Sequence, residues 1–549
     1  MYDTLTEYLD HWAEAHPDDT WLTDRHGDTI TDWSWSQVRE QAYALAAWQE
    51  AELSGPGVNV GLLSRNCAHW FIADIGTIAA GNVTVPMFTT LPRETAEYVM
   101  DFTDMQVLFV GQTENWEQVS AVLPEGIKLI ALPGATLEQP HLTWDEVVTP
   151  YLGKSPSHRA SRDDLVSIVF TSGTTGLPKG VMQTHASNVV PINRFLDVFV
   201  LPKRARKFSY LPLSHIAERQ IVEFSSLVDG GSVYFNENLL TILRDLPACK
   251  PHIMFGAPRV WEQLQQVIIG HFGGQEALDK ALAEDAASAG KQVQELLGLE
   301  EAAYLLTAAA PTPPALIHWY EQFGLILMEG FGQTEAMGLI ANSHDERRIG
   351  SIGKPRGEVE VALTDEDELI CKANGLSPGY YKMPEKTAET FKDGWVYTGD
   401  KARIDEDGFV YLTGRVKDYF KTIQGKFVAP TPIENEFSRN PHTDQICLLG
   451  RGYSKTVMVC VLNGFAQQAE RDAIEADLMT LAKQVNDVVD KHARLGAVII
   501  STDPWSIENA MLTPTLKIRR EQVEMKFGER AQELARQAAE QGQLLVEWL

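Results

Sequence analysis

The segment Thr171–Gly180 constrains this chain more than any other, because it joins glycines, hydroxyl side chains and a lysine directly after an apolar run at 165–170. The apolar run predicts a buried strand. Glycines let the backbone come close to a ligand, and hydroxyl, backbone N–H and lysine groups donate to phosphate oxygens. The segment therefore predicts a phosphate-binding loop formed by Thr171, Ser172, Gly173, Thr174, Thr175, Gly176 and Lys179.

This loop differs from two common phosphate-binding patterns. A Walker A loop has a wider spacing between its glycines and ends in Gly-Lys-Ser/Thr, whereas Gly173 and Gly176 are close together and Pro178 precedes the lysine. The kinase glycine-rich loop is also excluded, because neither His-Arg-Asp nor Asp-Phe-Gly follows it. Proline removes a donor and fixes φ, so we expect an open, mobile flap.

Composition limits the partners of the chain. With 549 residues it is long enough for more than one domain. A formal net charge of −28 disfavours nucleic acid and anionic membrane surfaces as partners. Since phosphate ligands are anions too, their site requires basic residues gathered locally against this overall charge.

Further features bear on location. No long uncharged apolar run predicts a transmembrane helix, and the acidic residues 1–7 do not resemble a secretory signal. The cysteines form no paired spacing, which predicts free thiols in a reducing compartment: Cys67, Cys249, Cys371, Cys447 and Cys460. The expected location is the cytoplasm, and peripheral membrane contact stays open.

The N-terminal part alternates strand-like and helical patterns. Strands are expected at 58–63, 83–87 and 107–110, and a helix at 70–80. This alternation predicts sheets with helices on their faces. The segment 270–301 has helical spacing and the composition of surface helices.

The chain becomes rich in strands and turns after Asp400. Residues 405–412 carry an Asp-Gly turn followed by a strand, which predicts a hairpin. Residues from Lys417 onward form a unit of domain size. The segment 521–549 is charged and predicted to be helical, with 544–549 expected to dock on the body rather than insert into a membrane.

Three segments together resemble a known family. Thr171–Gly180 and Glu329–Glu335 resemble signatures of the adenylate-forming (AMP-binding) superfamily, and Tyr210–Arg219 resembles its long-chain fatty acyl-CoA synthetase branch. The match runs from about Leu62 to Lys517 with the motifs in the family's order.

The resemblance implies an α/β fold. It consists of a large N-terminal domain of β-sheets flanked by helices plus a distorted β-barrel, residues 1–414, and a small mobile α+β C-terminal domain, residues 415–549. The resemblance also places the hinge between the two domains near Lys417, at the predicted domain junction. Hinge residues absorb backbone rotation and need not touch substrate.

The segment Glu329–Glu335 supplies groups that adenylation needs. Its glycines let the backbone approach the nucleotide, and Phe331 offers a face for adenine. Thr334 can bond the α-phosphate, and Glu335 together with Thr171 can hold Mg²⁺, which prefers oxygen ligands and phosphates. The resemblance assigns nucleotide binding to Gly330, Phe331, Gly332 and Gln333, and catalysis to Thr334 and Glu335.

Other roles follow from the resemblance alone. Asp400 and Arg415 match residues that bind ribose, and Lys421 and Gly425 match a loop that moves in for the second half-reaction. Lys517 matches the catalytic lysine, which stabilises the adenylation transition state by its charge.

Two matches concern the acid. His215 matches the family position where the carboxylate of the acid enters, and the resemblance assigns it to the catalytic residues. In the segment 307–311, Ala308 and Ala309 stand where the family has glycines, and their two added methyl groups narrow the space beside that carboxylate.

The expected function is ATP-dependent activation of a fatty acid to acyl-adenylate, followed by thioester formation with coenzyme A. Its expected substrates are ATP with Mg²⁺, a fatty acid and coenzyme A. Three alternatives stay open: loading of a carrier-protein phosphopantetheine, ligation of an aromatic or hydroxylated acid, and a non-catalytic acyl or nucleotide sensor.

Overall fold

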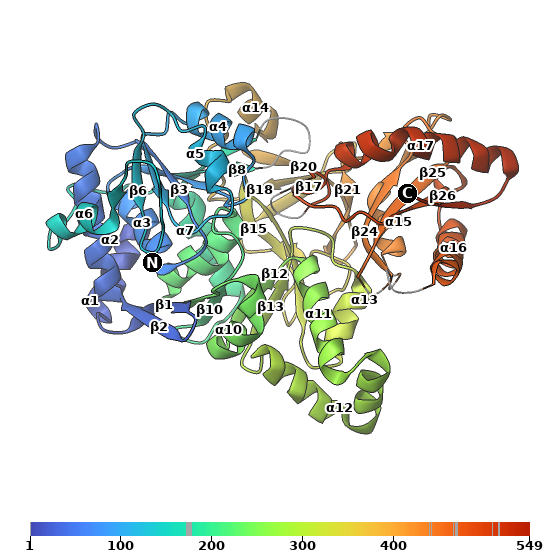
Figure 1. Ribbon diagram of the computed structural model, residues 1–549, viewed down its shortest axis with the longest axis horizontal. Coiled ribbons are helices and arrows are strands. Elements are labelled where there is room, and N and C mark those ends of the chain that lie inside the picture. The colour runs from blue at the N-terminus through green and yellow to red at the C-terminus, as the bar shows by residue number, and fades with distance from the viewer. Residues whose placement is uncertain are drawn as a thin grey trace.

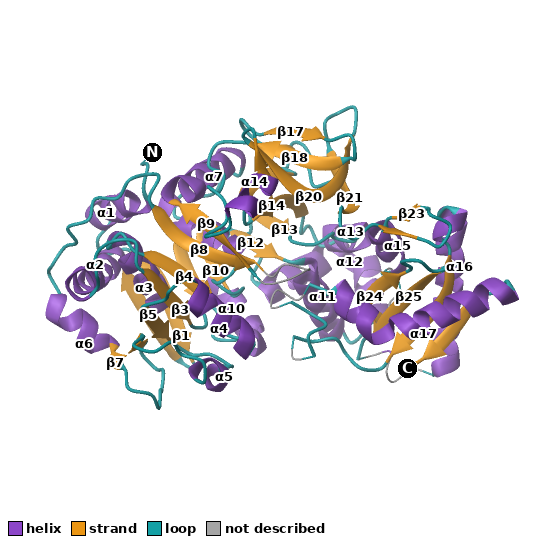
Figure 2. Cartoon of the chain, turned by 90° about the horizontal axis from the view of Figure 1, so that it is seen from above, coloured by secondary structure: helices purple, strands orange, loops and turns teal. Residues whose placement is uncertain are grey.

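The computed structural model describes residues 2–171, 178–438, 440, 442–464, 466, 470–507, 509–513 and 517–549. Three sheets form a large body, and a hairpin and a four-stranded sheet form the smaller C-terminal part of the described chain. Figure 1 shows the smaller part, orange to red, beside the body, and Figure 2 shows the same two parts from above.

A seven-stranded sheet of order β7-β6-β5-β3-β4-β8-β9 opens the body. Its pairings are parallel except for β8 with β9. All residues of β3, β4 and β5 are buried, as expected for parallel strands covered on both faces. The strands are β3 (Asn59–Leu63), β4 (Val83–Met87), β5 (Val107–Val110), β6 (Lys128–Ala131), β7 (Leu142–Thr143), β8 (Leu165–Thr171) and β9 (Lys179–Thr184).

Helices cover both faces of this sheet, as the alternating pattern predicts. One face packs against α1 (Leu5–Ala15), α2 (Trp35–Glu52), α3 (Ala68–Ala79) and α6 (Trp144–Val148). The other packs against α4 (Arg93–Phe102) and α5 (Trp116–Ser120). The three strands and the helix predicted within 58–110 are thus confirmed, with shifts of at most a few residues.

A nine-stranded sheet of order β16-β15-β14-β13-β12-β10-β11-β1-β2 forms the centre of the body. Its strands are β1 (Thr20–His26), β2 (Thr29–Ser34), β10 (Arg206–Ser209), β11 (Ser232–Phe235), β12 (Ile253–Gly256), β13 (Tyr304–Thr307), β14 (Leu327–Gln333), β15 (Ala336–Ala341) and β16 (Lys354–Pro355).

Two helical layers cover the central sheet. One contains α10 (Ile242–Cys249), α11 (Pro258–Phe272), α12 (Gln275–Leu297) and α13 (Pro314–Glu321). The other contains α7 (His185–Val198), α8 (Ile216–Glu218), the π-helix η2 (Arg219–Phe224) and α9 (Ser225–Asp229). The surface helices predicted at 270–301 are confirmed by α12, which ends where Gly298 takes a φ of +64°.

An antiparallel half-barrel completes the body. It contains β17 (Glu360–Leu363), β18 (Glu368–Lys372), β19 (Phe391–Lys392), β20 (Trp395–Ile404) and β21 (Val410–Arg415), with α14 (Pro384–Thr390) before β19. The predicted hairpin at 405–412 is confirmed as the turn between β20 and β21.

The C-terminal part begins with the hairpin β22 (Phe420–Lys421) and β23 (Phe427–Val428). Its sheet contains β24 (Thr443–Leu449), β25 (Thr456–Leu462), β26 (Leu495–Ser501) and β27 (Leu545–Trp548). One face packs against α15 (Pro430–Phe437) and α16 (Arg471–Val488), the other against α17 (Arg520–Gln541). The domain boundary at 414/415 stays a prediction.

The prediction for 521–549 was partly wrong. Helix α17 ends at Gln541, because Gly542 adopts a φ of +67°. The chain then forms β27, parallel to β26. The segment 544–549 thus packs on the protein as expected, but within the C-terminal part and not against the three-sheet body. Within the described residues, no helix has the length and apolar character needed to cross a membrane.

Candidate active site

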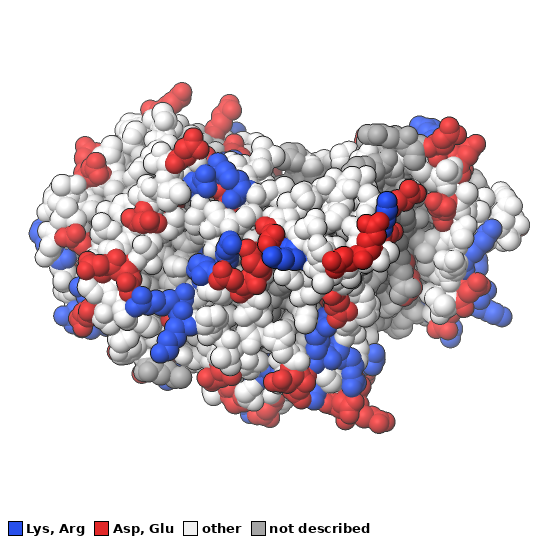
Figure 3. All heavy atoms as spheres, turned by 90° about the horizontal axis from the view of Figure 1, so that it is seen from below, with Lys and Arg blue, Asp and Glu red and all other residues white. Residues whose placement is uncertain are grey.

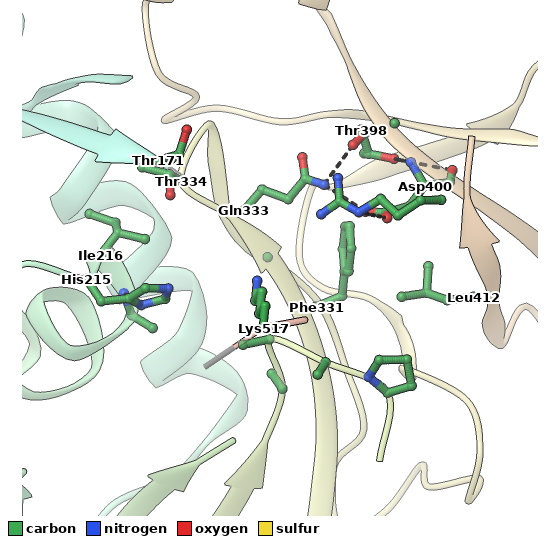
Figure 4. A pocket seen from close by; sticks show the side chains of 18 of the residues that line it. Thr171, His215, Ile216, Phe331, Gln333, Thr334, Thr398, Asp400, Leu412 and Lys517 are labelled. Carbon is green, nitrogen blue, oxygen red and sulfur yellow. Dashed lines mark hydrogen bonds and ion pairs between the residues drawn. The ribbon is translucent and has the colours of Figure 1, made fainter. Parts of the chain in front are cut away.

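A cavity of about 1820 Å³ brings together groups from sequence segments that are far apart. Its walls come from β8–β9, α8, β14–β15, β20–β21 and the C-terminal part. Figure 4 shows His215 on one side, Phe331 and Asp400 on the other, and Lys517 projecting between them. The predicted residues that line it are Thr171, Lys179, His215, Gly330, Phe331, Gly332, Gln333, Thr334, Glu335, Asp400, Arg415 and Lys517.

The register of β20 and β21 creates a carboxylate–guanidinium pair. Asp400 lies opposite Arg415 across the ladder, and Arg415 Nε is 2.9 Å from Asp400 Oδ1. Gln333 Nε2 donates to Asp400 Oδ2 at 2.7 Å and to the carbonyl of Thr398 at 2.8 Å. Burial raises the pKa of Asp400, while Arg415 and Gln333 oppose that rise. The carboxylate of Asp400 is therefore held in one orientation by donors on two strands, Gln333 of β14 and Arg415 of β21.

An irregularity in β14 accompanies the exposure of the motif Gly330–Glu335 to the cavity. Its pairing with β15 shifts register between Phe331 and Gln333, and such irregularities re-aim side chains. A Cβ on Gly332 would lie 3.1 Å from the backbone nitrogen of Gly338, so a larger residue would crowd β15. This wall can therefore be approached closely by a flat ligand such as a purine.

Glu335 belongs to a chain of polar groups that the sequence analysis missed. Tyr380 Oη donates to Glu335 Oε1 at 2.6 Å, and Lys179 Nζ donates to Tyr380 Oη at 2.9 Å. Burial and the charge of Glu335 raise the pKa of Tyr380, so it stays a donor. The Pro378-Gly379 turn before Tyr380 is the sequence signal that could have drawn attention to this tyrosine.

Thr171 and Lys179 face each other at the ends of β8 and β9. Burial lowers the pKa of Lys179, although Glu335 opposes that effect. The carboxylate of Glu335 and the hydroxyl of Thr171 are oxygen donors on one cavity, which fits Mg²⁺ held partly by substrate phosphates. Within the described residues, no group of three or more His, Cys, Asp or Glu gathers as a metal cage.

His215 caps the start of α8. Its Nδ1 accepts the backbone N–H of Ala217 at 3.2 Å. Burial, with the positive charge of Lys517, lowers the pKa of His215 to about 4. The ring is therefore neutral at neutral pH, and Nδ1 is the acceptor.

Lys517 comes from the C-terminal part. Its backbone is held by Thr513, since Thr513 N donates to Lys517 O at 2.8 Å and Lys517 N donates to Thr513 Oγ1 at 3.1 Å. Reduced hydration lowers the pKa of its ammonium and Arg415 lowers it further, while Asp400 and Glu335 raise it. Its side chain remains accessible to solvent within the cavity.

Several predicted residues are not brought into this cavity. Lys421 and Gly425 lie on the β22–β23 hairpin, outside the cavity lining, and Lys421 Nζ sits 4.7 Å from the centre of the Phe427 ring. The loop residues Ser172, Gly173, Thr174, Thr175 and Gly176 lie outside the described residues. The roles expected for both groups stay predictions.

An apolar arm of the cavity lies between α7, the π-helix η2 and the central sheet. The sequence analysis could not assemble it, because its residues are distant along the chain. They include Ile192, Phe195, Phe199, Ile216, Ala217, Ile221, Phe255, Leu306 and Met337. This arm meets the polar part of the cavity near His215 and suits an apolar tail attached to a polar head.

Ala309 lines the cavity with a strained backbone. Its φ is +71°, in the left-handed region that favours glycine. We expect Ala309→Gly to raise the free energy of unfolding by ~0.5 kcal/mol, because relief of strain exceeds the entropy that glycine adds to the unfolded chain. Urea denaturation tests this, with Ala310→Gly as the matched control that should lower stability. A fall for both variants would contradict the argument.

The cavity lining carries charges of both signs. On the face seen in Figure 3, basic side chains also lie among acidic ones. Lys179, Arg415 and Lys517 line the cavity together with Glu335 and Asp400. An anionic ligand therefore finds basic partners in the cavity, although the chain as a whole has a net charge of −28.

The family with this arrangement is that of the AMP-binding enzymes, and the chain belongs to it. The "AMP-binding enzyme" family matches residues 9–381, and the "AMP-binding enzyme C-terminal domain" family matches residues 417–538. The superfamily resemblance of the three motifs is thereby confirmed.

Curated relatives support the long-chain branch. Fatty acyl-CoA synthetase A of Dictyostelium discoideum is 27% identical over 543 residues, covering 86% of this chain and 81% of that protein. Long-chain-fatty-acid–CoA ligase FadD15 of Mycobacterium tuberculosis is 27% identical over 528 residues, covering 86% of this chain and 87% of that protein.

Solved structures share the fold. The anthranilate CoA ligase AuaEII with anthranoyl-AMP superposes with a TM-score of 0.80 at 21% identity, covering 96% of this chain and 98% of that one. The A domain of carboxylic acid reductase from Segniliparus rugosus gives 0.78 at 21% identity, covering 97% and 94%. The predicted α/β class with a separate C-terminal domain is confirmed.

Proposed function

We propose that this chain is an AMP-forming ligase that activates a long-chain fatty acid with ATP and transfers the acyl group to coenzyme A. One observation carries the proposal: a single cavity joins an apolar arm to Glu335, Asp400 and Lys517. The arm suits an acyl chain, and the polar groups suit a nucleotide. The family membership and the long-chain synthetases among its relatives point to the same reaction.

In the first half-reaction, a carboxylate oxygen of the fatty acid attacks the α-phosphorus of ATP, and the bond to pyrophosphate breaks. Asp400 and Arg415 hold the ribose, and Phe331 lies against the adenine. Thr171 and Glu335 would hold Mg²⁺, which supplies charge neutralisation on the phosphates when bound. Lys517 donates to the attacking carboxylate and the α-phosphate and stabilises their developing charge.

In the second half-reaction, the C-terminal domain rotates about Lys417 and Lys517 withdraws. The hairpin with Lys421 and Gly425 then approaches the adenylate and leaves a path for the pantetheine arm. The thiolate of coenzyme A attacks the acyl carbon, the C–O bond to AMP breaks, and AMP leaves. Motions of this kind complete a site in stages.

We place the enzyme in the cytoplasm. All five cysteines are free thiols, which suits a reducing compartment. Two Arabidopsis thaliana relatives, by contrast, are named as peroxisomal synthetases.

The testing experiment measures pyrophosphate release with MgATP and hexadecanoate, with and without coenzyme A, together with product masses. We expect pyrophosphate release and an acyl-CoA mass. Acyl-AMP without a thioester would instead indicate an acceptor such as a carrier protein. Failure with hexadecanoate and success with an aromatic or hydroxylated acid would overturn the fatty acid as substrate, and no release with any acid would favour a sensor.

The carboxylate of Asp400 gives a specific prediction. We expect Asp400→Ala to raise the KM for ATP by about 10- to 100-fold, because the variant loses a charged acceptor for the ribose hydroxyls and leaves Arg415 unpaired. The KM for the acid should change far less. Steady-state kinetics with each substrate varied test this, with the exposed Glu366→Gln as a charge-matched control. An unchanged KM for ATP would remove Asp400 from the nucleotide site.

A further inference from the structure

An ion pair joins the body to the C-terminal part away from the hinge. Arg259, in the first turn of α11, pairs with Asp444 on β24. Both views in Figures 1 and 2 show α11 and β24 next to each other. The two side chains are 39% and 17% exposed, so the pair is partly shielded from water and stronger than a pair on open surface.

The local backbone aims Asp444 at α11. The pairing of β24 with β25 shifts register between Thr443 and Gln445, which leaves Asp444 at an irregularity of the strand. Glu262, one turn along α11, also lies 3.4 Å from Arg259. Burial raises the pKa of Glu262, and Asp444 raises it further, whereas Arg259 opposes both. The positive charge of Arg259 thus compensates the carboxylates of Glu262 and Asp444 where the body meets the C-terminal part.

A short chain of contacts leads from Asp444 to Lys517. The neighbouring Gln445 donates through Nε2 to the carbonyl of Trp505 at 2.9 Å and accepts the backbone N–H of Trp505 at 2.8 Å. Trp505 is 2% exposed and anchored in the core under α17. The next residue, Ser506, accepts the N–H of Leu512 at 3.0 Å.

The last step reaches the catalytic loop. Leu512 forms a bridge with Ile518, and Thr513 bonds the backbone of Lys517 at both its N–H and its carbonyl. Backbone hydrogen bonds and buried side-chain contacts therefore connect Asp444 to Lys517. The contact of Asp444 with α11 thereby constrains where Lys517 lies. Arg259, Asp444 and Lys517 all line the same cavity.

We propose that Arg259 and Asp444 are positioning residues for adenylation, because their ion pair holds the C-terminal part where Lys517 enters the cavity. This inference rests on the proposed function. The pair stabilises this arrangement of the two parts and is lost when the C-terminal domain rotates. It therefore favours the first half-reaction over the second.

The test separates the two half-reactions in the full-length enzyme. Pyrophosphate release without coenzyme A reports adenylation, and thioester formation from supplied hexadecanoyl-AMP and coenzyme A reports the second step. We expect Asp444→Asn and Arg259→Gln each to slow adenylation about fivefold, while the second step is unchanged or faster. The double variant should be no slower than either single variant, because both remove the same interaction.

Two further variants separate positioning from folding. Asp444→Glu keeps the charge and should restore adenylation. Asp477→Asn removes the same charge from the same part of the chain, where Asp477 pairs with His442 at 3.1 Å, and should leave both steps unchanged. Melting temperatures should agree among all variants.

Equal slowing of both half-reactions, additive effects in the double variant, or the same loss in Asp477→Asn would overturn the inference. If Asp444→Asn fails to fold, Arg259→Gln tests the inference alone. Its adenylation rate should then fall relative to its rate of thioester formation. A wild-type enzyme that forms no acyl-AMP with any acid would instead count against the proposed function.

Discussion

Replacing Lys517 with alanine is expected to slow acyl-adenylate formation by about 10²- to 10³-fold. Lys517 is the cation that the C-terminal part projects between His215 and Asp400. Negative charge grows on the α-phosphate as the carboxylate attacks, so the ammonium is worth more in the transition state than in the bound substrates. The loss should therefore appear in kcat for adenylation more than in the KM for ATP.

The same substitution should largely spare thioester formation from supplied hexadecanoyl-AMP and coenzyme A. In the second half-reaction that we propose, the adenylate already exists and Lys517 withdraws with the rotated C-terminal domain. Single-turnover measurements of each step test this, with Lys526→Ala as a control that removes an exposed lysine of α17. Equal loss in both steps would show that Lys517 serves folding or general binding.

The sequence predicts the parts of the fold that depend on local pattern. The strand at 107–110 is a continuous apolar run and the strand at 83–87 is interrupted only by Thr84, a pattern that occurs where helices cover both faces of a parallel sheet. The hairpin at 405–412 follows from its Asp-Gly turn, and it places Asp400 opposite Arg415, a pairing that the sequence analysis did not predict. Both are short-range features, so the sequence contains nearly all the information they need.

The missed features depend on contacts across the chain. Tyr380 reaches Glu335 from a turn that no motif includes, and the apolar arm combines α7, the π-helix and three strands of the central sheet. Strand β27 was missed because the segment before the C-terminus follows a long charged helix and pairs with β26 only through tertiary packing.

The second prediction with a large effect concerns stability. Arg219 is 0% exposed and pairs with Asp74 of α3, and its Nε lies 3.2 Å from Glu223. Burial and the charge of Asp74 raise the pKa of Glu223 well above its ordinary value. We expect Arg219→Met to lower the free energy of unfolding by about 3–5 kcal/mol, because it leaves buried carboxyl groups without their counter-charge.

Urea denaturation measures this effect. The surface variant Arg162→Met is the control, since Arg162 is 52% exposed and its loss should cost less than about 0.5 kcal/mol. A loss for Arg219→Met as small as for the control would mean that the carboxyl groups are solvated or neutral without the arginine.

The three buried charged residues Arg219, Asp74 and Glu223 can also be replaced together by apolar residues. We expect the triple variant Arg219→Met, Asp74→Leu, Glu223→Leu to regain at least half of the lost free energy, because apolar side chains of similar volume leave no buried charge unpaired. Arg219 and Glu223 lie on the π-helix, whose Gln220 and Ile221 line the cavity that holds the apolar arm. A stable triple variant with an altered preference for acyl chain length would show that the buried charges shape this helix for the substrate. A stable variant with unchanged preference would limit their role to the core.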